Sequence, residues 1–390
     1  MAIKPSRKLT RVLVYIGWTA EYRRLLMRGV QSFADTQQGW ELINGGLPVG
    51  EAYRWQPHGI IGILDWLPKI TENFARYNVP IVSLFDYRFR ATINIYNDNE
   101  TVGRLAAQYF LDRHYHHFAF LGMQSHPESI IRERGFVNAL KNAGQLCHVK
   151  RISDRENQRI LNHTWSPINR SLIKWLDALR KPVAVLCGND ITARWFMESC
   201  REQFRIPEEV AVLGIDNDEL WCETSRPQLS SVIIPWQTIG YTAAQWLSKL
   251  MAGRKPPGDC KVFVPPVGIQ TRQLSDITAV DDLDMAAALN FIQHHACDPI
   301  SVHDVLTEVP LDRRRLERFF QNKLGRTPHD EIRRVQLERA KYLLAKTDLT
   351  INQVAARCGI YPQNFARVFH QTIGQKPSEY RNLFRPDQTG

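Results

Sequence analysis

The sequence contains no long apolar run, and it lacks the short motifs of nucleotide and zinc-protease chemistry. No stretch approaches 18 consecutive apolar residues, so we expect no membrane-spanning helix. The motifs GxGxxG, HExxH and GxxxxGK followed by Ser or Thr are all absent, which leaves a phosphate-binding loop and a zincin site without support. The first apolar segment is too short for the core of a signal peptide, and no cleavage site follows it. These absences favour a cytoplasmic location.

The cysteines give no sign of a disulfide framework. All seven are scattered and none forms a CxxC pair, which favours reduced thiols and argues against a zinc site. His114, His116 and His117 cluster without a further ligand at metal-binding spacing. Asp216 and Asp218 are close in sequence, but closeness does not show the different protonation states that catalytic pairs need. We therefore expect no enzyme, no metal and no cofactor.

Excess positive charge is almost absent from most of the chain and is concentrated near its end. The protein carries 50 Lys+Arg against 40 Asp+Glu, a formal net charge of +10. Residues 311–385 hold 16 Lys+Arg and 7 Asp+Glu, whereas the remainder holds 34 and 33. A positive field on so short a segment is typical of a polyanion partner, although a solvated basic face would explain the charge alone equally well.

The same region repeats itself at a spacing of 49 residues. The recurring pairs are Ser301 and Thr350, Val305 and Val354, Leu316 and Phe365, Arg318 and Arg367, Phe320 and Phe369, Gly325 and Gly374, and Pro328 and Pro377. Agreement at this many positions indicates two copies of one supersecondary unit.

Each copy has the pattern of two helices joined by a tight turn. Ser301 or Thr350 can cap a short helix, and Asp312 or Pro362 suits the start of a second one. Basic residues in the first turns of the second helix are typical of a helix-turn-helix unit, because the N-terminal part of one helix meets the base edges in the major groove of DNA. A long helix, roughly residues 330–346, would join the two units.

These motifs resemble the AraC/XylS family of regulators. The patterns Leu-x-Arg-x-Phe, Gly-x-x-Pro, ERAKYLL and PSEYR occur in the order of that family. The resemblance implies an all-α double helix-turn-helix domain over residues 299–390 that binds double-stranded DNA. The implied DNA contacts are Arg313, Arg314 and Arg318 from the first unit and Gln363, Asn364 and Arg367 from the second. This sequence departs from the family in two ways: the second unit has one residue fewer between the turn glycine, Gly359, and its recognition helix, and Tyr361 stands where the family has a small capping residue.

The part before this region alternates short apolar runs with amphipathic segments. Strand candidates are residues 12–16, 59–64, 81–84, 117–121, 184–187 and 210–214, and helix candidates are 22–37, 99–113, 130–143 and 193–204. Repeated strand-then-helix order predicts parallel sheets of the doubly wound α/β type, in which ligands bind beyond the carboxyl ends of the strands.

Polar residues at those ends resemble the sugar-contacting positions of LacI/GalR-type sensors. The fragments YNDNETVG, IIRERGF, CGNDITAR and VLGIDND occur in the order of that family. The resemblance implies a two-lobed, three-layer α/β sensor of the periplasmic-binding-protein type over residues 1–275. The implied sugar contacts are Trp18, Tyr22, Arg24, Asp98, Arg132, Asp190 and Asp216. Helix capping is the competing role for the aspartates, and core packing is the competing role for the tryptophan.

The order of the two parts narrows the resemblance. The DNA-binding part follows the sensor through a linker and connecting helix at residues 276–298. This order, with VPPVGIQTRQLSD and LNFIQHHA at the junction, resembles the group of xylose operon regulators. The resemblance implies a homodimeric activator that responds to a monosaccharide, with D-xylose favoured over another pentose or hexose, and that works with RNA polymerase. The alternatives are a constitutive DNA-binding protein with a vestigial sensor, and a sugar sensor that signals through a protein partner.

Overall fold

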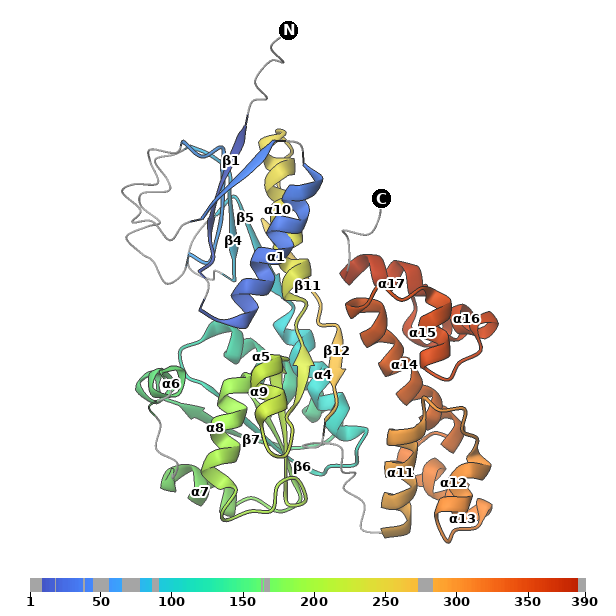
Figure 1. Cartoon of the computed structure of the whole chain (residues 1–390). Helices are drawn as coiled ribbons and strands as arrows, with labels where there is room; N and C mark the ends of the chain where they lie inside the picture. The colour runs from blue at the N-terminus through green and yellow to red at the C-terminus, as the bar shows by residue number, and fades with distance from the viewer. Residues whose placement is uncertain are drawn as a thin grey trace. The chain divides into compact units, whose positions relative to one another are not determined.

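The computed structural model describes residues 9–17, 19–37, 39–44, 56–64, 78–85, 91–162, 164, 169–272 and 283–384 (Figure 1). The chain forms two compact units, and neither is continuous in sequence. The first unit contains residues 1–98, 235–265 and 385–390, and the second contains residues 99–234 and 266–384. The chain therefore leaves the first lobe, builds a second one, and returns before it continues into the C-terminal helices.

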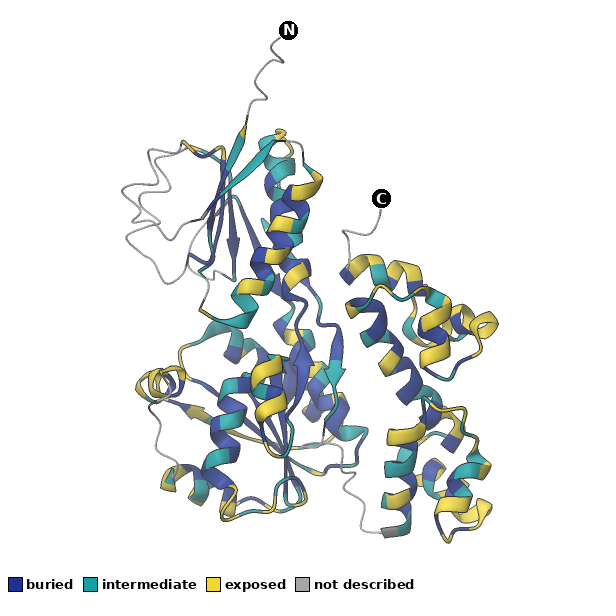
Figure 2. Ribbon diagram, in the orientation of Figure 1, coloured by how far each residue is buried: buried dark blue, intermediate teal, exposed yellow. Residues whose placement is uncertain are grey.

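The first unit is built on a sheet of six parallel strands, counted over the described residues, in the order β11-β5-β4-β3-β1-β2. These strands are β1 (Thr10–Tyr15), β2 (Trp40–Asn44), β3 (Gly59–Gly62), β4 (Ile81–Leu84), β5 (Ile93–Asn97) and β11 (Lys261–Val264). Every residue of β3, β4 and β5 is buried, as expected for central strands of a parallel sheet covered on both faces (Figure 2). The helices α1 (Glu21–Thr36) and α10 (Trp236–Met251) pack against each other in this unit.

The second unit begins with another sheet, in the order β12-β10-β9-β8-β6-β7. Its strands are β6 (His117–Met123), β7 (Cys147–Ile152), β8 (Val183–Cys187), β9 (Val210–Asp216), β10 (Ser230–Ile233) and β12 (Gly268–Gln270). All neighbouring strands are parallel except β12, which runs antiparallel to β10. The helices of this lobe are α4 (Asn99–Leu111), α5 (Pro127–Asn142), α6 (Asp154–Leu161), α7 (Arg170–Asp177), α8 (Asp190–Cys200) and α9 (Glu219–Thr224). These two sheets confirm the predicted two-lobed α/β sensor.

The C-terminal part of the second unit is entirely helical in its described residues. Its helices are α11 (Leu283–His295), α12 (Val302–Glu308), α13 (Arg313–Phe319), the π-helical turn η4 (Phe320–Leu324), α14 (Pro328–Lys346), α15 (Ile351–Arg357), α16 (Pro362–Ile373) and α17 (Pro377–Phe384). The 49-residue repeat is visible residue by residue: α12 and α15 begin and end at equivalent positions, and so do α13 with η4 and α16. Gly325 and Gly374 both end the second helix in the left-handed conformation. The predicted double helix-turn-helix domain is confirmed.

The helix α14, which joins the two helix-turn-helix units, starts two residues earlier than predicted. Thr327 is its N-cap: its hydroxyl accepts from the Asp330 backbone N–H at 3.1 Å, and the Asp330 carboxylate accepts from the Thr327 backbone N–H at 3.1 Å. Pro328 then occupies the first helical position, where its missing N–H costs nothing.

Candidate functional site

Arg132 on α5 is fixed at the carboxyl edge of the second sheet. Its side chain is 4% exposed, its Nε donates to Asn99 Oδ1 at 2.8 Å, and its Nη1 donates to the Gly188 carbonyl at 2.7 Å. Its Nη2 lies 3.6 Å from Asp216 Oδ1, at the end of β9. Because a buried charge needs partners, these three contacts hold the guanidinium in one place between the ends of β8 and β9.

Asp216 is held in a strained backbone conformation beside that arginine. Its φ of 116° lies where non-glycine residues rarely occur, and such strain is concentrated at functional sites. Burial raises the pKa of Asp216 to about 7 against the opposing charge of Arg132, and the neighbouring Asp218 and Glu128 raise it further. Within the described residues, Asp216 Oδ1 is buried without a hydrogen-bond partner. The group can therefore accept a hydrogen bond from a ligand hydroxyl.

Asp190 lies deeper, at the first position of α8, and is 1% exposed. Its Oδ1 accepts from the Ser231 hydroxyl at 2.6 Å, and its Oδ2 accepts from the Asp218 backbone N–H at 2.8 Å. Burial and the nearby Asp216 raise the pKa of Asp190 well above its usual range. Asn189, and not Asp190, caps α8. These bonds give Asp190 a positioning role for the loop that carries Asp216, and its predicted sugar contact stays a prediction.

The other predicted sugar residues belong to the first unit. Tyr22 packs on Trp236 with ring centroids 5.1 Å apart, and its hydroxyl accepts from Arg23 Nε at 3.0 Å. Arg24 is exposed, and the Asp98 backbone N–H donates to the Val264 carbonyl at 2.9 Å. Trp18 lies outside the described residues. The six described residues of this set are thus divided between the two units, and the contact of all seven with a sugar stays a prediction.

Sequence reasoning missed a polar group beside Arg132. His126 lies 3.0 Å from Asn157 Nδ2 through Nε2 and 3.6 Å from Glu128 Oε1 through Nδ1. The charge of Glu128 acts on both Arg132 and Asp216. The signal was present, because the run HPES comes after the strand β6 and the two residues Gln124 and Ser125, in a region where ligand-facing polar residues are expected.

All six predicted DNA-contacting side chains are exposed on the second helix of a helix-turn-helix unit. In α16, Gln363, Asn364 and Arg367 point away from a face on which Phe365 and Phe369 are fully buried. In α13, Arg314 and Arg318 are likewise exposed around the buried Leu316, and Arg313 pairs with Glu317 at 2.8 Å. The helices therefore present polar groups outward and bury only their apolar stripe.

The two recognition helices begin differently. The Asp312 side chain accepts from the Arg315 backbone N–H at 2.8 Å and caps α13. Tyr361 occupies the equivalent position before α16, is 75% exposed, and makes no side-chain cap bond. The turn from α12 to α13 is as long as the turn from α15 to α16. The second helix-turn-helix unit therefore differs from the first here in lacking the side-chain cap.

Three comparisons relate these sites to known proteins. Residues 107–273 match the family of periplasmic binding protein-like domains, and residues 306–383 match a helix-turn-helix domain family. The xylose operon regulatory protein of Haemophilus influenzae is 31% identical over 334 residues, which are 83% of this chain and 84% of that protein. The one from Escherichia coli K12 is 28% identical over 396 residues, covering 96% and 98%. The solved structure of a xylose-binding transcription activator is 27% identical, with a TM-score of 0.58 over 97% of this chain and 99% of that one.

The chain belongs to the family of xylose operon regulatory proteins. It is a DNA-binding, sugar-responsive regulator, as the sequence motifs predicted. The relatives are transcription regulators and not enzymes. Across the described residues, no helix has both the length and the apolar character needed to cross a membrane.

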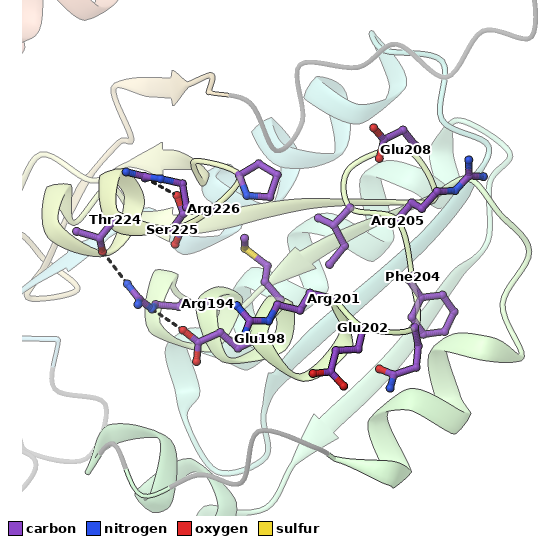
Figure 3. Close-up of a pocket in the computed structure, with 14 residues that line it drawn as sticks. Arg194, Glu198, Arg201, Glu202, Phe204, Arg205, Glu208, Thr224, Ser225 and Arg226 are labelled. Atoms are coloured by element: carbon purple, nitrogen blue, oxygen red, sulfur yellow. Dashed lines mark hydrogen bonds and ion pairs between the residues drawn. The ribbon is translucent and has the colours of Figure 1, made fainter.

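A pocket of about 550 Å³ in the second lobe of this family member lies apart from the predicted sugar residues (Figure 3). Arg194, Arg201, Arg205 and Arg226 line it together with acidic residues. Arg194 donates to Glu198 at 2.9 Å and to Thr224 at 2.6 Å, so its charge is already satisfied by the lobe itself. We assign no ligand to this pocket.

Proposed function

We propose that this chain is a homodimeric transcription activator whose sensor binds D-xylose and whose C-terminal helices read paired promoter half-sites. The observation that carries the proposal is the pairing of the buried Arg132 with the partly exposed Asp216 at the carboxyl edge of a periplasmic-binding-type lobe. Support for D-xylose comes from the relatives, which are named for the xylose operon, and from the solved relative, which is described as xylose-binding.

The pair has the chemistry of a polyol site. A sugar hydroxyl both donates and accepts, so the Arg132 guanidinium can donate to its oxygen while Asp216 Oδ1 accepts its proton. Since both groups are held by the lobe before a ligand arrives, little conformational freedom is lost on binding. The proposed sugar contacts also include Trp18, Tyr22, Arg24, Asp98 and Asp190.

DNA reading is proposed for the exposed side chains of α13 and α16. Arginine can donate two parallel hydrogen bonds to guanine O6 and N7, and glutamine or asparagine can do the same for adenine. Arg314 is exposed, and among the described residues no acidic side chain forms an ion pair with it. Burial lowers the pKa of Arg333 on α14, and the positive charge of the nearby Arg367 lowers it further. Such crowded positive charge is relieved when a phosphate binds.

Coupling between sensor and DNA-binding helices is proposed through their contact inside the second unit. The Tyr380 hydroxyl on α17 donates to the Val267 carbonyl, just before β12, at 2.6 Å in a buried position. Val267 belongs to the same buried apolar cluster as Leu337 and Leu344 of α14. A shift of β12 would therefore move the buried contacts that α14 and α17 make with the adjoining Val267.

A group of ion pairs also lies between the sensor lobe and the DNA-binding helices. Arg326 Nη1 lies 3.6 Å from Asp112 Oδ1, and the Arg326 Nη2 donates to the Asp112 carbonyl at 3.3 Å. Glu331 is almost fully buried and pairs with both Arg326 and Arg334. Burial raises the pKa of Glu331, but the bond from Arg334 and the surrounding arginine charges outweigh it and lower that pKa. A sugar changes DNA binding only if it binds two arrangements of this contact with different affinity.

The remaining features are proposed on the same basis. Residues 1–275 would form the sensor, 276–298 the linker and connecting helix, and 299–390 the DNA-binding domain. A dimer would present two DNA-binding domains to two half-sites, and an activator would contact RNA polymerase in the cytoplasm. We propose no catalytic step.

The first test is a thermal-shift titration with D-xylose, L-arabinose, D-ribose and D-glucose, followed by promoter-DNA binding with and without the best ligand. We expect D-xylose to raise the melting temperature most, since a ligand of the folded state alone stabilises it by mass action. No shift with any monosaccharide would favour a vestigial sensor. A shift that leaves DNA affinity, DNA geometry and promoter output unchanged would refute the proposed coupling.

A variant pair locates the sugar site. Arg132→Lys keeps the charge but removes the planar fork that reaches Asn99 and Gly188 together. We expect it to lose the sugar response while it retains DNA binding without sugar. Arg134→Lys is the matched control, because Arg134 lies on the same helix with its side chain 59% exposed. Equal sugar responses in the two variants would contradict the assignment.

A further inference from the structure

Two cysteines distant in sequence lie side by side in the DNA-binding helices. Cys297 follows α11, and Cys358 ends α15 in the second helix-turn-helix unit. A Cβ placed on Gly359 would lie 2.9 Å from the Cys297 carbonyl oxygen. Gln336 on α14 holds both segments, because its Nε2 donates to the Ala296 carbonyl at 2.8 Å and to the Gly359 carbonyl at 3.3 Å. The backbone thus brings the two thiols together.

The two thiols differ in access and in charge. Cys358 is fully buried, whereas Cys297 is only half-buried. A hydrogen bond from the Cys358 thiol lowers the pKa of Cys297 against the effect of burial, and the positive charge of Arg339 lowers it further. The same bond and burial raise the pKa of Cys358 far above the usual thiol range. Cys297 is therefore the more accessible sulfur and has a lowered pKa, and Cys358 is its buried neighbour.

This combination is the one that oxidation-sensitive proteins use. Sensor cysteines are accessible, have a lowered pKa, and stand next to a second cysteine that resolves the oxidised form. Cys147 and Cys200 differ from Cys297, since burial raises the pKa of each to about 12. A peroxide molecule should therefore react at Cys297 before it reacts at these thiols.

We propose that Cys297 and Cys358 form a reversible disulfide in response to hydrogen peroxide, and that this bond lowers DNA affinity. The Cys297 thiolate attacks one peroxide oxygen, the O–O bond breaks, and the departing hydroxide takes a proton to become water. The resulting sulfenic acid is attacked by the Cys358 sulfur, the S–O bond breaks, and the hydroxide leaves with the Cys358 proton as a second water. Two thiols are oxidised to one disulfide, and one peroxide is reduced to two waters.

The position of the bond explains its effect on DNA. Cys358 lies in the turn before α16, four residues ahead of Pro362, and Cys297 lies five residues ahead of α12. A covalent link is shorter than a contact between unbonded sulfurs, so the turn must move to form it. The start of α16 carries Gln363 and Asn364, and it would move with that turn. The effect on DNA rests on the proposed function, but the disulfide does not.

The test uses the full-length protein treated with hydrogen peroxide near stoichiometry. Mass spectrometry of non-reduced peptides should show one cross-link, between Cys297 and Cys358, that dithiothreitol removes. Cys358→Ser keeps a hydrogen-bond donor beside Cys297 but cannot form the disulfide, so it should leave a sulfenic acid on Cys297 that dimedone traps, and Cys297→Ser should form neither product. No cross-link, or a cross-link between other cysteines, would overturn the proposal.

DNA affinity is measured by fluorescence anisotropy on the same samples. Peroxide should weaken promoter binding of the natural chain, dithiothreitol should restore it, and Cys297→Ser should bind equally well with and without peroxide. Loss of affinity in Cys297→Ser, or unchanged affinity in the cross-linked chain, would overturn the regulatory effect. If the reduced chain fails to bind promoter DNA at all, the proposed function fails, and the cross-link still reports on the cysteine pair.

Discussion

Replacing Gly103 by alanine tests whether the close crossing of α4 and α5 positions Arg132. A Cβ at Gly103 would lie 2.2 Å from the Arg132 carbonyl oxygen and 2.5 Å from the Phe136 backbone nitrogen. Gly135 on α5 is the reciprocal partner, since its Cβ would lie 2.3 Å from the Glu100 carbonyl oxygen. Because these neighbours are backbone atoms, they cannot turn aside, and the helices must separate by about 1 Å.

The size of the effect follows from three contributions. Alanine is a better helix former than glycine by about 1 kcal/mol, which favours the variant. Overpacking costs about 1–3 kcal/mol. Moving α5 also weakens the bonds from Arg132 to Asn99 and Gly188, and hydrogen bonds to a charged group contribute about 1.5–3 kcal/mol each. We expect a net loss of about 2–4 kcal/mol of unfolding free energy and at least about a tenfold loss of sugar affinity.

The measurements are urea unfolding and calorimetric titration with D-xylose. Gly258→Ala is the matched control, because a Cβ there meets nothing within 4 Å and its backbone is unstrained. If the two variants have the same stability and the same sugar affinity, the close crossing does not position Arg132.

Three further substitutions test the rest of the molecule. Burial and the charge of Arg326 lower the pKa of His114 to about 4, so the folded state disfavours the charged ring. The free energy of unfolding should therefore fall as pH falls from about 6.5 towards 4. Asparagine tolerates the left-handed backbone at this position, so His114→Asn should remove this part of the decline. Urea unfolding at a series of pH values measures it. Tyr380→Phe leaves the buried Val267 carbonyl without its donor and should cost about 1–3 kcal/mol; unchanged stability and an unchanged sugar effect on DNA binding would remove this contact from the coupling. Tyr361→Ser supplies the missing cap of α16 and should stabilise the chain by about 1 kcal/mol; a melting temperature no higher than that of the natural chain would contradict this.

The C-terminal helices were predictable because their pattern is local. Capping residues, turn residues and the apolar stripe all lie within one 49-residue copy, and the second copy repeats them. The start of α14 was placed at residue 330 because the capping role of Thr327 was not recognised. A Thr followed three residues later by Asp is the local signal that would have placed it.

The strands were predictable only where they are apolar. The six predicted runs correspond to β1, β3, β4, β6, β8 and β9. The strand β7 was missed because its sequence, CHVKRI, is largely solvent-facing at the edge of the sheet. Edge strands bury little, so neither a continuous apolar run nor a clean alternation marks them.

The sugar-site residues show the same limit. The resemblance to LacI/GalR-type sensors implies Arg132 and Asp216 as sugar contacts, and the structure brings the two side chains together. The roles of Asn99 and Ser231, which hold Arg132 and Asp190, depend on neighbours 33 and 41 residues away. Only the tertiary fold determines such pairings, and no local pattern in one sequence reports them.

The two helix-turn-helix units have matching backbones but unequal charge, which predicts a division of labour on DNA. The helix α13 carries four arginines, whereas α16 carries only Arg367. Two of the four are already engaged, since Arg313 pairs with Glu317 at 2.8 Å and Arg315 approaches Asp284 at 4.0 Å. Arg314 and Arg318 remain as candidates for a new contact, and Arg314 lies in the first turn of α13, the part of a recognition helix that meets the base edges.

Arg314→Ala should weaken promoter binding by about 1–3 kcal/mol if this residue reads a guanine, with a larger loss on promoter DNA than on random DNA. If it contacts only phosphate, the loss should be equal on both, and the slope of log K against log salt should fall by about one unit. Anisotropy titrations at several salt concentrations on both DNAs separate these outcomes. Arg313→Ala is the control, because its guanidinium already has a partner in Glu317. A smaller loss for Arg314→Ala than for Arg313→Ala would refute the view that Arg314 contributes more to DNA binding than the paired Arg313.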